Sequence, residues 1–367
     1  MNRSWLWVAL AGLSLHLGGM AACSALAPQP EPSVLMPANG GAITDVAIQF
    51  HDEGAELFLP VFGELLQSLS PETTVHVVVA DSHDRRVFAV AAADWFPNGG
   101  GPTLVYSETG RPITSWMRDR LAVLSDGDQT TLLAPAAPMR GPEARVYDWL
   151  VPWSLAHDHG MDAAVARPTF LFDGGDLIAD ETFAYVADPL FGRNPDASRG
   201  ELIVDLEHEL GLPVLALRDT PDHHIGMFVT PLGHGRVLVA DPDLGLSLLS
   251  TTPEPGGIGM PVMSDPEQLQ RFRNVADQLE EAGLEVISMP IVPSTEPWVW
   301  MSYNNAMLET RDGQLHVYMP TYGVPALDDA ATEVWVGQGA VVHPIDVSDL
   351  FRLGGSVRCL TAPILRN

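Results

Sequence analysis

Of the two cysteines in this chain, Cys359 lies in the segment best suited to chemistry. It follows a glycine pair, Gly354 and Gly355, which lets the backbone turn tightly and approach a ligand closely. Arg358 stands directly beside the thiol and favours its ionised form. The alternative is that Cys359 is a small buried apolar side chain. This segment alone leaves a nucleophile and a packing residue both open.

A second segment, from Trp116 through Arg118 to Asp119, carries groups that recognise a cation. A carboxylate such as Asp119 can hold a guanidinium through a fork of hydrogen bonds, and Trp116 can stack on a cation. The alternative is a surface pair of Arg118 and Asp119 beside a buried tryptophan.

A third segment places Asp173 and Asp176 on either side of a glycine pair, after the apolar run Thr169–Phe172. The two carboxylates are suited to binding a cation, and the alternative is an acidic turn between two strands.

A fourth segment contains His223 and His224 ahead of an expected strand at Met227–Thr230. A histidine at the start of a strand is a candidate proton shuttle. Neighbouring side chains on a strand point to opposite faces, so we expect no metal ion shared by the two rings. A polar loop is preferred to a metal site for three further candidate ligands, His157, His159 and Asp162.

These segments must be positioned by a mixed α/β framework, because short β-type runs recur with helical patterns between them. We expect strands at Thr44–Phe50, Thr74–Ala80, Thr103–Tyr106, Thr169–Phe172, Phe183–Val186, Val214–Leu217, Met227–Thr230, Arg236–Val239, Glu285–Met289, Trp298–Met301 and Leu315–Met319. We expect helices at Ala55–Ser68, Ala144–Ala156, Glu201–Leu210, Pro266–Glu281 and Ala326–Val334. The proline- and glycine-rich stretch Thr251–Ser264 indicates a long loop, either a lid or a disordered segment.

The first 41 residues have the character of an export signal and a tether. Residues 1–22 combine Arg3, an apolar core and small residues ahead of Cys23, which is the pattern of a signal peptide. The small residues before Cys23 resemble a bacterial lipobox, which implies lipidation of Cys23 and a lipid-anchored protein of the cell envelope, facing the periplasm or the exterior from the outer membrane. A simple secretory signal is the alternative. Residues 23–41 are expected to be the tether and residues 42–367 a single catalytic domain.

Composition excludes several function classes. Aspartate and glutamate total 47 against 19 basic residues, so nucleic acid is not expected as a partner and a cationic substrate is attracted. All 19 basic residues are arginine, which excludes lysine Schiff-base chemistry and a P-loop lysine. One cysteine outside the export signal excludes an internal disulfide and a cysteine-rich zinc site. We therefore expect no cofactor and no metal.

The order of the four segments resembles the guanidino-modifying enzyme superfamily, which includes arginine and agmatine deiminases, bacterial peptidylarginine deiminases, dimethylarginine hydrolases and amidinotransferases. The resemblance is carried by Trp116-x-Arg118-Asp119, Asp173 to Asp176, His224-Ile225, Ser302-Tyr303-Asn304-Asn305 and the Cys359 segment. It implies a five-fold pseudosymmetric α/β propeller of ββαβ units around a central site.

The resemblance also implies roles for these residues. Cys359 is the expected nucleophile, His224 the proton donor and then the base that activates water, and Asp173 the carboxylate that contacts substrate and orients the histidine. Substrate contacts are expected from Trp116, Arg118, Asp119, Asp176 and Asn304. His223 is left open as an alternative to His224.

One position departs from the pattern. Many relatives carry an aspartate two residues after the histidine, whereas Gly226 stands there in this chain. Compensation by Asp176 or Asp222, a different substrate, and lost activity are the alternatives. The leading hypothesis is an exported Cys-dependent hydrolase of arginine, a peptidyl-arginine or agmatine that forms a covalent thiouronium intermediate. An amidinotransferase and an inactive ligand-binding lipoprotein are the other two.

Overall fold

The structure is a computed structural model that describes residues 33–127, 129–135, 143–158, 161, 163–250 and 259–367. The chain divides into two units, Met1–Glu31 and Pro32–Asn367, and the fold is that of the second unit. The expected signal peptide, Cys23 and the tether up to residue 32 lie outside the described residues. Within the described ranges, no helix is both long and apolar enough to cross a membrane.

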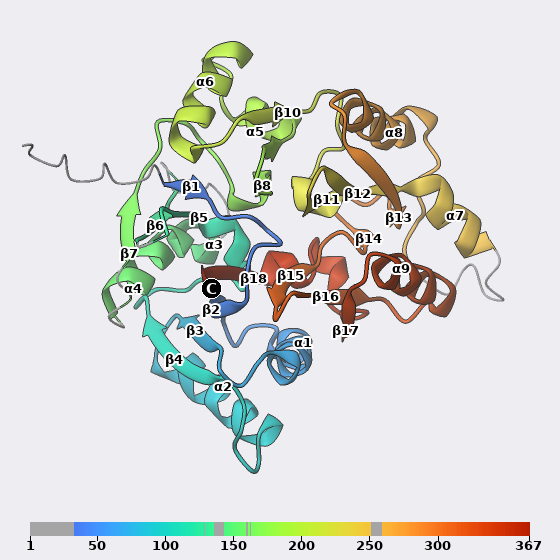
Figure 1. The fold of residues 1–367 in the computed structure, drawn as a ribbon. Helices are drawn as coiled ribbons and strands as arrows, with labels where there is room; N and C mark the ends of the chain where they lie inside the picture. The colour runs from blue at the N-terminus through green and yellow to red at the C-terminus, as the bar shows by residue number, and fades with distance from the viewer. Residues whose placement is uncertain (1–32, 128, 136–142, 159–160, 162, 251–258) are drawn as a thin grey trace, which may run out of the picture. The chain divides into compact units, whose positions relative to one another are not determined.

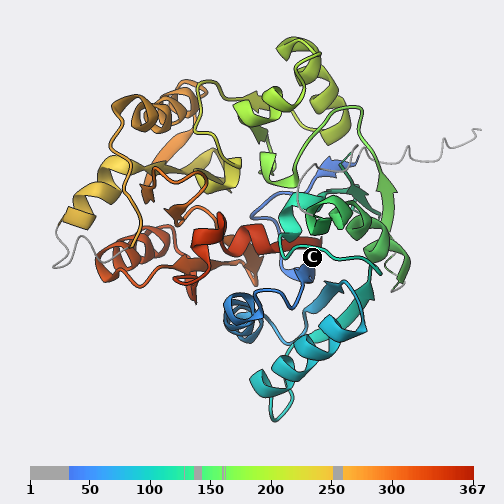
Figure 2. The ribbon, with the colours of Figure 1, turned by 180° about the vertical axis from the view of Figure 1, so that it is seen from behind.

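Five small sheets make up the Pro32–Asn367 unit, and they surround a common centre in Figures 1 and 2. One sheet has the order β18-β2-β3-β4, with β18 Thr361–Arg366, β2 Ile43–Phe50, β3 Thr74–Val79 and β4 Thr103–Glu108. The next has the order β1-β5-β6-β7, with β1 Val34–Leu35, β5 Ala122–Ser125, β6 Thr130–Leu133 and β7 Ala163–Ala166.

The other three sheets follow in chain order. The third is β10-β9-β8, with β8 Leu177–Ala179, β9 Ala184–Val186 and β10 Val214–Ala216. The fourth is β11-β12-β13-β14, with β11 Val229–Gly233, β12 Arg236–Asp241, β13 Glu285–Pro293 and β14 Trp300–Ser302. The fifth is β15-β16-β17, with β15 Met307–Arg311, β16 Gln314–Thr321 and β17 Val341–Asp346.

Helices connect strands within each sheet, except α10, which lies between β17 and β18 of two different sheets. They are α1 Ala55–Ser68, α2 Ser82–Trp95, α3 Glu143–Tyr147, α4 Val151–Asp158, α5 Asp188–Arg193, α6 Arg199–Leu210, α7 Pro242–Ser250, α8 Pro266–Glu281, α9 Pro325–Gly337 and α10 Val357–Leu360. Five 3₁₀ turns complete the described elements: η1 Met117–Arg120, η2 Asp148–Leu150, η3 Gly174–Asp176, η4 Ile225–Met227 and η5 Phe351–Leu353.

Each sheet repeats one motif, an antiparallel strand pair followed by a helical connection to a parallel strand. In the fourth sheet, for example, β11 pairs antiparallel with β12, and β12 pairs parallel with β13 after α7 and α8. The same pattern holds for β15-β16-β17, β5-β6-β7 and β8-β9-β10. The mixed α/β class expected from the sequence is therefore confirmed, with ββαβ as the repeating unit.

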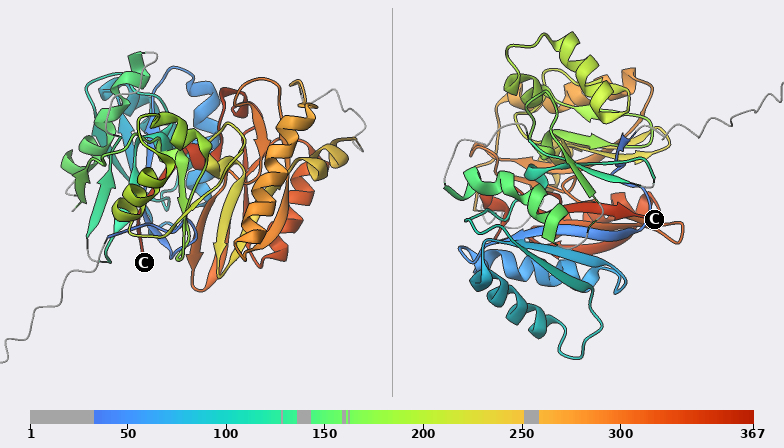
Figure 3. Two further views of the ribbon diagram at one scale, coloured as in Figure 1. Left: turned by 90° about the horizontal axis from the view of Figure 1, so that it is seen from above. Right: turned by 90° about the vertical axis from the view of Figure 1, so that its left-hand side faces the viewer.

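The first repeat is completed by the last strand of the chain. β18 pairs antiparallel with β2, and β2 pairs parallel with β3 through the α1 connection. The two strands lie side by side in the edge views of Figure 3. This pairing carries α10, and with it Cys359, into contact with the η1 turn from the first third of the chain.

Central strands are buried over most of their length because helices and neighbouring elements cover both faces. All five residues of β3 after Thr74 are buried, as are the last five of β2. Helix α8 begins where its sequence predicts, since the side chain of Asp265 accepts from the backbone N–H of Glu267 at 2.9 Å.

Three sequence expectations differ from the structure. Residues 169–172 form no strand, and residues 33–41 of the expected tether belong to the folded unit, because Val34–Leu35 pairs with β5. The single helix expected at 144–156 is divided into α3, η2 and α4. Pro152 explains the division, since proline lacks the backbone N–H that a continuous helix would donate to the carbonyl oxygen of Asp148.

Candidate active site

The four sequence segments singled out for chemistry meet at one cavity of about 790 Å³. Its lining residues are Thr114, Trp116, Asp119, Arg145, Asp173, Pro189, Gly192, Arg193, Asp222, His223, His224, Trp298, Leu353, Gly354 and Cys359. Three carboxylates, four cationic or titratable nitrogen groups and one thiol of this set face a space large enough for a small molecule or one side chain of a peptide.

The repeating architecture explains why these residues converge. Each of the five repeats presents a polar side chain from the short segment just before its first strand, β5, β8, β11, β15 or β18. These side chains, in chain order, are Asp119, Asp173, His224, Asn305 and Cys359. Because the five repeats surround one centre (Figure 1), segments at equivalent positions meet there.

The glycine pair between Asp173 and Asp176 is required by close packing. A Cβ atom on Gly174 would overlap the backbone oxygens of Arg118 and Leu121, and one on Gly175 would overlap the ring of His224. The segment is therefore a 3₁₀ turn pressed between η1 and the histidine, and a solvent-exposed acidic turn is excluded.

Cys359 is nearly buried, with 3% of its surface exposed, and its sulfur is held by an amide. The Nδ2 of Asn305 donates to the sulfur at 3.2 Å. The Oδ1 of Asn305 accepts from the hydroxyl of Ser356 at 2.9 Å and from the backbone N–H of Cys359 at 3.3 Å. Asn305 therefore fixes both the position of the thiol and the turn that carries it.

His224 lies between two carboxylates. Its Nε2 is 3.4 Å from Oδ1 of Asp173, and its Nδ1 is 3.8 Å from Oδ1 of Asp119. Burial disfavours the charged ring, but Asp173, Asp119 and a hydrogen bond with Cys359 together raise the pKa of His224 well above its usual value. His224 is accordingly an imidazolium at neutral pH, suited to donate a proton.

His223 has the opposite electrostatic character. Burial and the charge of His224 lower the pKa of His223 to about 3. Its Nδ1 accepts from the backbone N–H of His224 at 2.7 Å, so its Nε2, 3.2 Å from the carbonyl oxygen of Trp298, carries the proton. His223 is a neutral ring that shapes the cavity wall. The expected strand does not start at this pair, since His224 begins the η4 turn and both rings face the same cavity.

Asp173 is fully buried and is held by the turn that it begins. Its side chain accepts from the backbone N–H of Gly175 at 3.3 Å, while its own N–H donates to Asp176 at 2.8 Å. Burial opposes its ionisation, but His224 and nearby arginines lower the pKa of Asp173 below its usual value. Asp173 is therefore a carboxylate facing the imidazolium.

Asp176 does not line the cavity. It accepts from the backbone of Asp173 and from Nε of Arg193 at 2.7 Å. Burial and the neighbouring charge of Asp173 raise the pKa of Asp176. The structure thus places Asp176 behind Asp173, where it positions the turn, rather than in contact with a ligand in the cavity.

Arg145 is a residue that the sequence analysis missed. Its Nη1 lies 2.5 Å from Oδ2 of Asp119 and its Nη2 lies 3.5 Å from Oδ2 of Asp173. An internal guanidinium therefore bridges the two carboxylates that face the imidazolium. Its position in α3, inside an otherwise unremarkable helical pattern, gave no signal in the sequence.

Two more expected contact residues lie away from the cavity. Asn304 is buried, and its Nδ2 donates to the hydroxyl of Thr230 and to the carbonyl oxygen of Leu238, each at 3.1 Å. Arg118 lines a separate, smaller cavity. The neighbour of Asn304, Asn305, is the asparagine that reaches the thiol. Gly226 is likewise absent from the lining of the large cavity, whereas Asp222 is part of it.

The three groups Asp119, Asp173 and His224 bring ligand-type atoms within 4.8 Å of one another, a spacing that also suits a metal ion. In this structure the guanidinium of Arg145 occupies the two carboxylates. Nδ1 of His157, considered above as a ligand, donates to the carbonyl oxygen of Trp153 at 2.9 Å, whereas residues 159 and 162 lie outside the described residues.

Comparison with solved structures identifies the fold. A C. jejuni agmatine deiminase has a TM-score of 0.67 and 13% identity, covering 90% of this chain and 95% of that chain. An Enterococcus faecalis agmatine deiminase has a TM-score of 0.65 and 14% identity, covering 90% and 95%. A structure described as a putative peptidyl-arginine deiminase has a TM-score of 0.67 and 14% identity, covering 90% and 98%. The fold is therefore that of the guanidino-modifying enzymes.

The sequence assigns the family within that class. Residues 49–364 match the Porphyromonas-type peptidyl-arginine deiminase family, and the chain belongs to it. No curated protein sequence matches the chain. The family consists of hydrolases that act on C–N bonds of amidines, which confirms the enzyme class expected from the sequence.

Proposed function

We propose that this protein is a Cys-dependent deiminase that hydrolyses the guanidino group of a small molecule or peptide. The observation that carries the proposal is the meeting of a thiol, an imidazolium and two carboxylates, from four different repeats, at one cavity. A guanidinium is a poor electrophile, so its carbon must be held against a thiolate in a fixed geometry.

In the proposed first step, the thiolate of Cys359 attacks the guanidinium carbon, and Asp119 and Asp173 hold the guanidinium nitrogens. His224 gives its proton to the departing amine as the C–N bond breaks, which leaves an S-bound thiouronium. In the second step, water attacks the same carbon, His224 takes the proton, and the C–S bond breaks to give a ureido product and a free thiol. Nitrogen thus leaves as ammonia or an amine.

Arg145 competes with a substrate for the two carboxylates in this proposed cycle. The two carboxylates assigned to the substrate already face the guanidinium of Arg145. A substrate guanidinium binds to them only when Arg145 moves aside, so binding is an exchange of one guanidinium for another. The exchange favours substrates that make further contacts with the cavity wall. Trp116, Trp298 and Asp222 line that wall and are available for such contacts.

Three substrate types fit this chemistry: free arginine, agmatine and a peptidyl-arginine. The family match favours peptidyl-arginine as the first substrate to test. We would assay the purified protein with all three and measure ureido product and ammonia, with and without added acceptor amines. Ureido product from at least one substrate supports the deiminase, whereas transfer to the amine identifies an amidinotransferase.

A ligand-binding role without turnover is the second candidate, and one observation favours it. Arg145 already contacts Asp119 and Asp173, and Nη2 of Arg193 lies 3.9 Å from Oδ2 of Asp173, so internal arginines neutralise these two acids of the cavity. Binding of guanidino ligands without any ureido product, in protein whose thiol is shown to be reduced, would establish this role and exclude the hydrolase.

We also propose that the chain is exported and anchored by lipid on Cys23, in the bacterial cell envelope. Support comes from the signal-like residues 1–22 and the small residues ahead of Cys23. Mass spectrometry of the native protein should show an N-terminal diacylglyceryl cysteine, and Cys23→Ala should move the protein out of the membrane fraction. An unmodified Cys23 in protein recovered from soluble fractions would exclude the anchor.

A further inference from the structure

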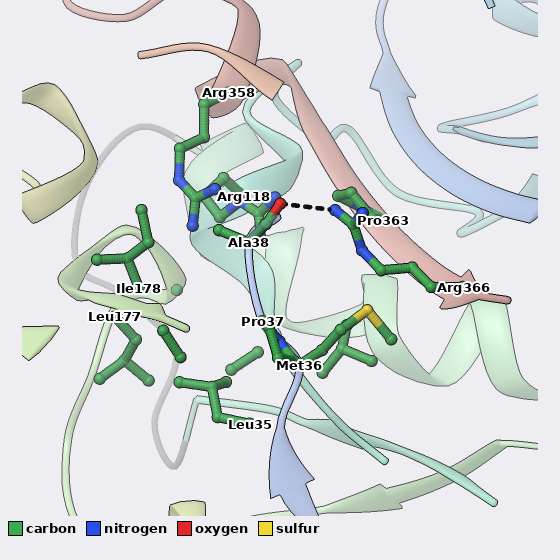
Figure 4. A pocket seen from close by; sticks show the side chains of 14 residues that line it. Leu35, Met36, Pro37, Ala38, Arg118, Leu177, Ile178, Arg358, Pro363 and Arg366 are labelled. Carbon is green, nitrogen blue, oxygen red and sulfur yellow. Dashed lines mark hydrogen bonds between the residues drawn. The ribbon is translucent and has the colours of Figure 1, made fainter. Parts of the chain in front are cut away.

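Arg118 and Arg358 line a second cavity, of about 30 Å³, which shares no lining residue with the cavity of Cys359. Figure 4 shows both guanidinium groups pointing into this arginine pocket, with Arg366 on its far side. The other walls are mostly apolar and come from the β1 segment and from β8, including Leu177 and Ile178.

Arg366 already has its partners. Its two terminal nitrogens donate to four backbone carbonyl oxygens, those of Ala38, Gly40, Gly41 and Leu308. Arg118 and Arg358 differ, because neither guanidinium forms a hydrogen bond or a salt bridge with a carboxylate among the described residues. Two cations therefore share the pocket, and no carboxylate of the described ranges is in direct contact with either one.

Burial makes this arrangement unfavourable unless a counter-charge is present. Arg358 is 8% exposed, and burial together with the charge of Arg118 lowers the pKa of Arg358 well below its usual value. Burial lowers the pKa of Arg118 to about 10. Apolar walls weaken dielectric screening, so the attraction of both groups for an anion is stronger than in water.

Gly226 explains why the protein itself supplies no acid here. A Cβ atom at position 226 would lie 2.8 Å from both Cδ and Nε of Arg358. The stem of Arg358 therefore occupies the space that a side chain at position 226 would need. Because position 226 is a glycine, it offers no carboxylate to neutralise the guanidinium of Arg358.

We propose that the arginine pocket is a binding site for a small monovalent anion of halide size, held between the guanidinium groups of Arg118 and Arg358. A water-sized body needs roughly 10–15 Å³ measured in this way, so the cavity admits one or two such bodies and excludes phosphate esters and nucleotides. The site is separate from the substrate cavity and does not depend on the proposed hydrolase activity.

The first test is thermal unfolding of the full purified protein with chloride or bromide replaced stepwise by gluconate at constant ionic strength. A bound halide stabilises the folded state in a saturable way. We expect a rise in Tm that saturates with chloride and with bromide and is absent with gluconate alone. The same Tm in all three salts would overturn the proposal.

Two variants connect the effect to the pocket. Gly226→Asp places a carboxylate beside the Arg358 side chain, and Arg358→Met removes the guanidinium but keeps an unbranched apolar side chain. Both should lose the halide-dependent rise in Tm. The matched control is Arg273→Gln, which removes an exposed guanidinium paired with Asp243 and should keep the full rise. A full halide response in both pocket variants would contradict the assignment.

Crystals of the unaltered protein soaked in bromide give a direct measurement that does not depend on how the variants fold. We expect an anomalous-scattering peak between Arg118 and Arg358. A pocket that stays empty at saturating bromide would exclude the site.

Discussion

The side-chain amide of Asn305 holds Cys359 at two points, donating to the sulfur at 3.2 Å and accepting from the backbone N–H at 3.3 Å. A hydrogen bond to a charged group contributes about 1.5–3 kcal/mol. The amide therefore stabilises a thiolate and, through Ser356, the turn in which the thiol sits.

We predict that Asn305→Asp lowers kcat by about 10–100-fold, because the carboxylate keeps the acceptor but loses the donor to the sulfur. Steady-state kinetics measures the loss, and thermal unfolding checks the fold. The control is Asn304→Ala, which should cost about 1–3 kcal/mol of stability with kcat nearly unchanged in the folded fraction. The reverse pattern would assign the thiol contact to Asn304.

Replacing Cys359 by alanine should abolish ureido product while the Tm stays within a few degrees of the parent, because only one buried sulfur is lost. Selective labelling of Cys359 by a haloacetamidine, read by mass spectrometry, is the companion measurement. Turnover by the alanine variant at the parent rate would exclude a covalent mechanism.

Arg145→Ala should strengthen binding of guanidino ligands, since it removes the cation that competes for Asp119 and Asp173. Calorimetry in a Cys359→Ser background is expected to show a gain on the order of ten-fold, or about 1.4 kcal/mol. Arg273→Gln, on an exposed face, is the control. Weaker binding by the alanine variant would show instead that Arg145 contacts the ligand.

The two histidines should respond differently to substitution. His224→Asn removes the imidazolium and is expected to abolish turnover, whereas His223→Gln keeps a neutral polar side chain and should lower kcat by about ten-fold or less. Activity that survives in His224→Asn and disappears in His223→Gln would transfer the proton-donor role to His223.

The raised pKa of His224 also predicts how stability depends on pH. Because the folded-state pKa lies above the unfolded value of 6.5, this ion pair contributes its full stabilisation below about pH 6.5 and loses it as pH rises through the folded pKa. Denaturant unfolding at pH 6 and pH 9 should therefore show a larger decline in the parent than in His224→Asn. Equal declines would place the ring outside the ion pair.

Sequence patterns predicted most of the elements and most of the chemical groups, but not their contacts. Helices α1 and α8 begin and end at their expected residues because apolar spacing and caps are local signals. Helix α2 was missed, since its first turns, from Ser82, are dominated by polar and charged residues. Strand β18 was missed because it is completed by pairing with β2, more than 300 residues earlier.

In the site, too, residue types were predictable from local sequence, whereas contacts between distant segments were not. Cys359, His224, Asp173 and Asp119 were identified by residue type and order, whereas Arg145 was not. A lone arginine within a helical pattern carries no local sign of the carboxylates it meets, which come from two other repeats. Asn304 was selected from the sequence, whereas the side chain that contacts the thiol is that of its neighbour Asn305, because side-chain direction is not encoded in local composition.

Because each repeat contributes one short segment to the site, the reacting groups come together only when all the repeats are folded. No single repeat, and no pair of repeats, contains a complete set of reacting groups, so an incompletely folded chain carries an ordinary thiol with no partner for proton transfer. Catalytic competence is therefore a property of the fully closed ring alone. Local unfolding of any one repeat should abolish activity before the rest of the molecule unfolds.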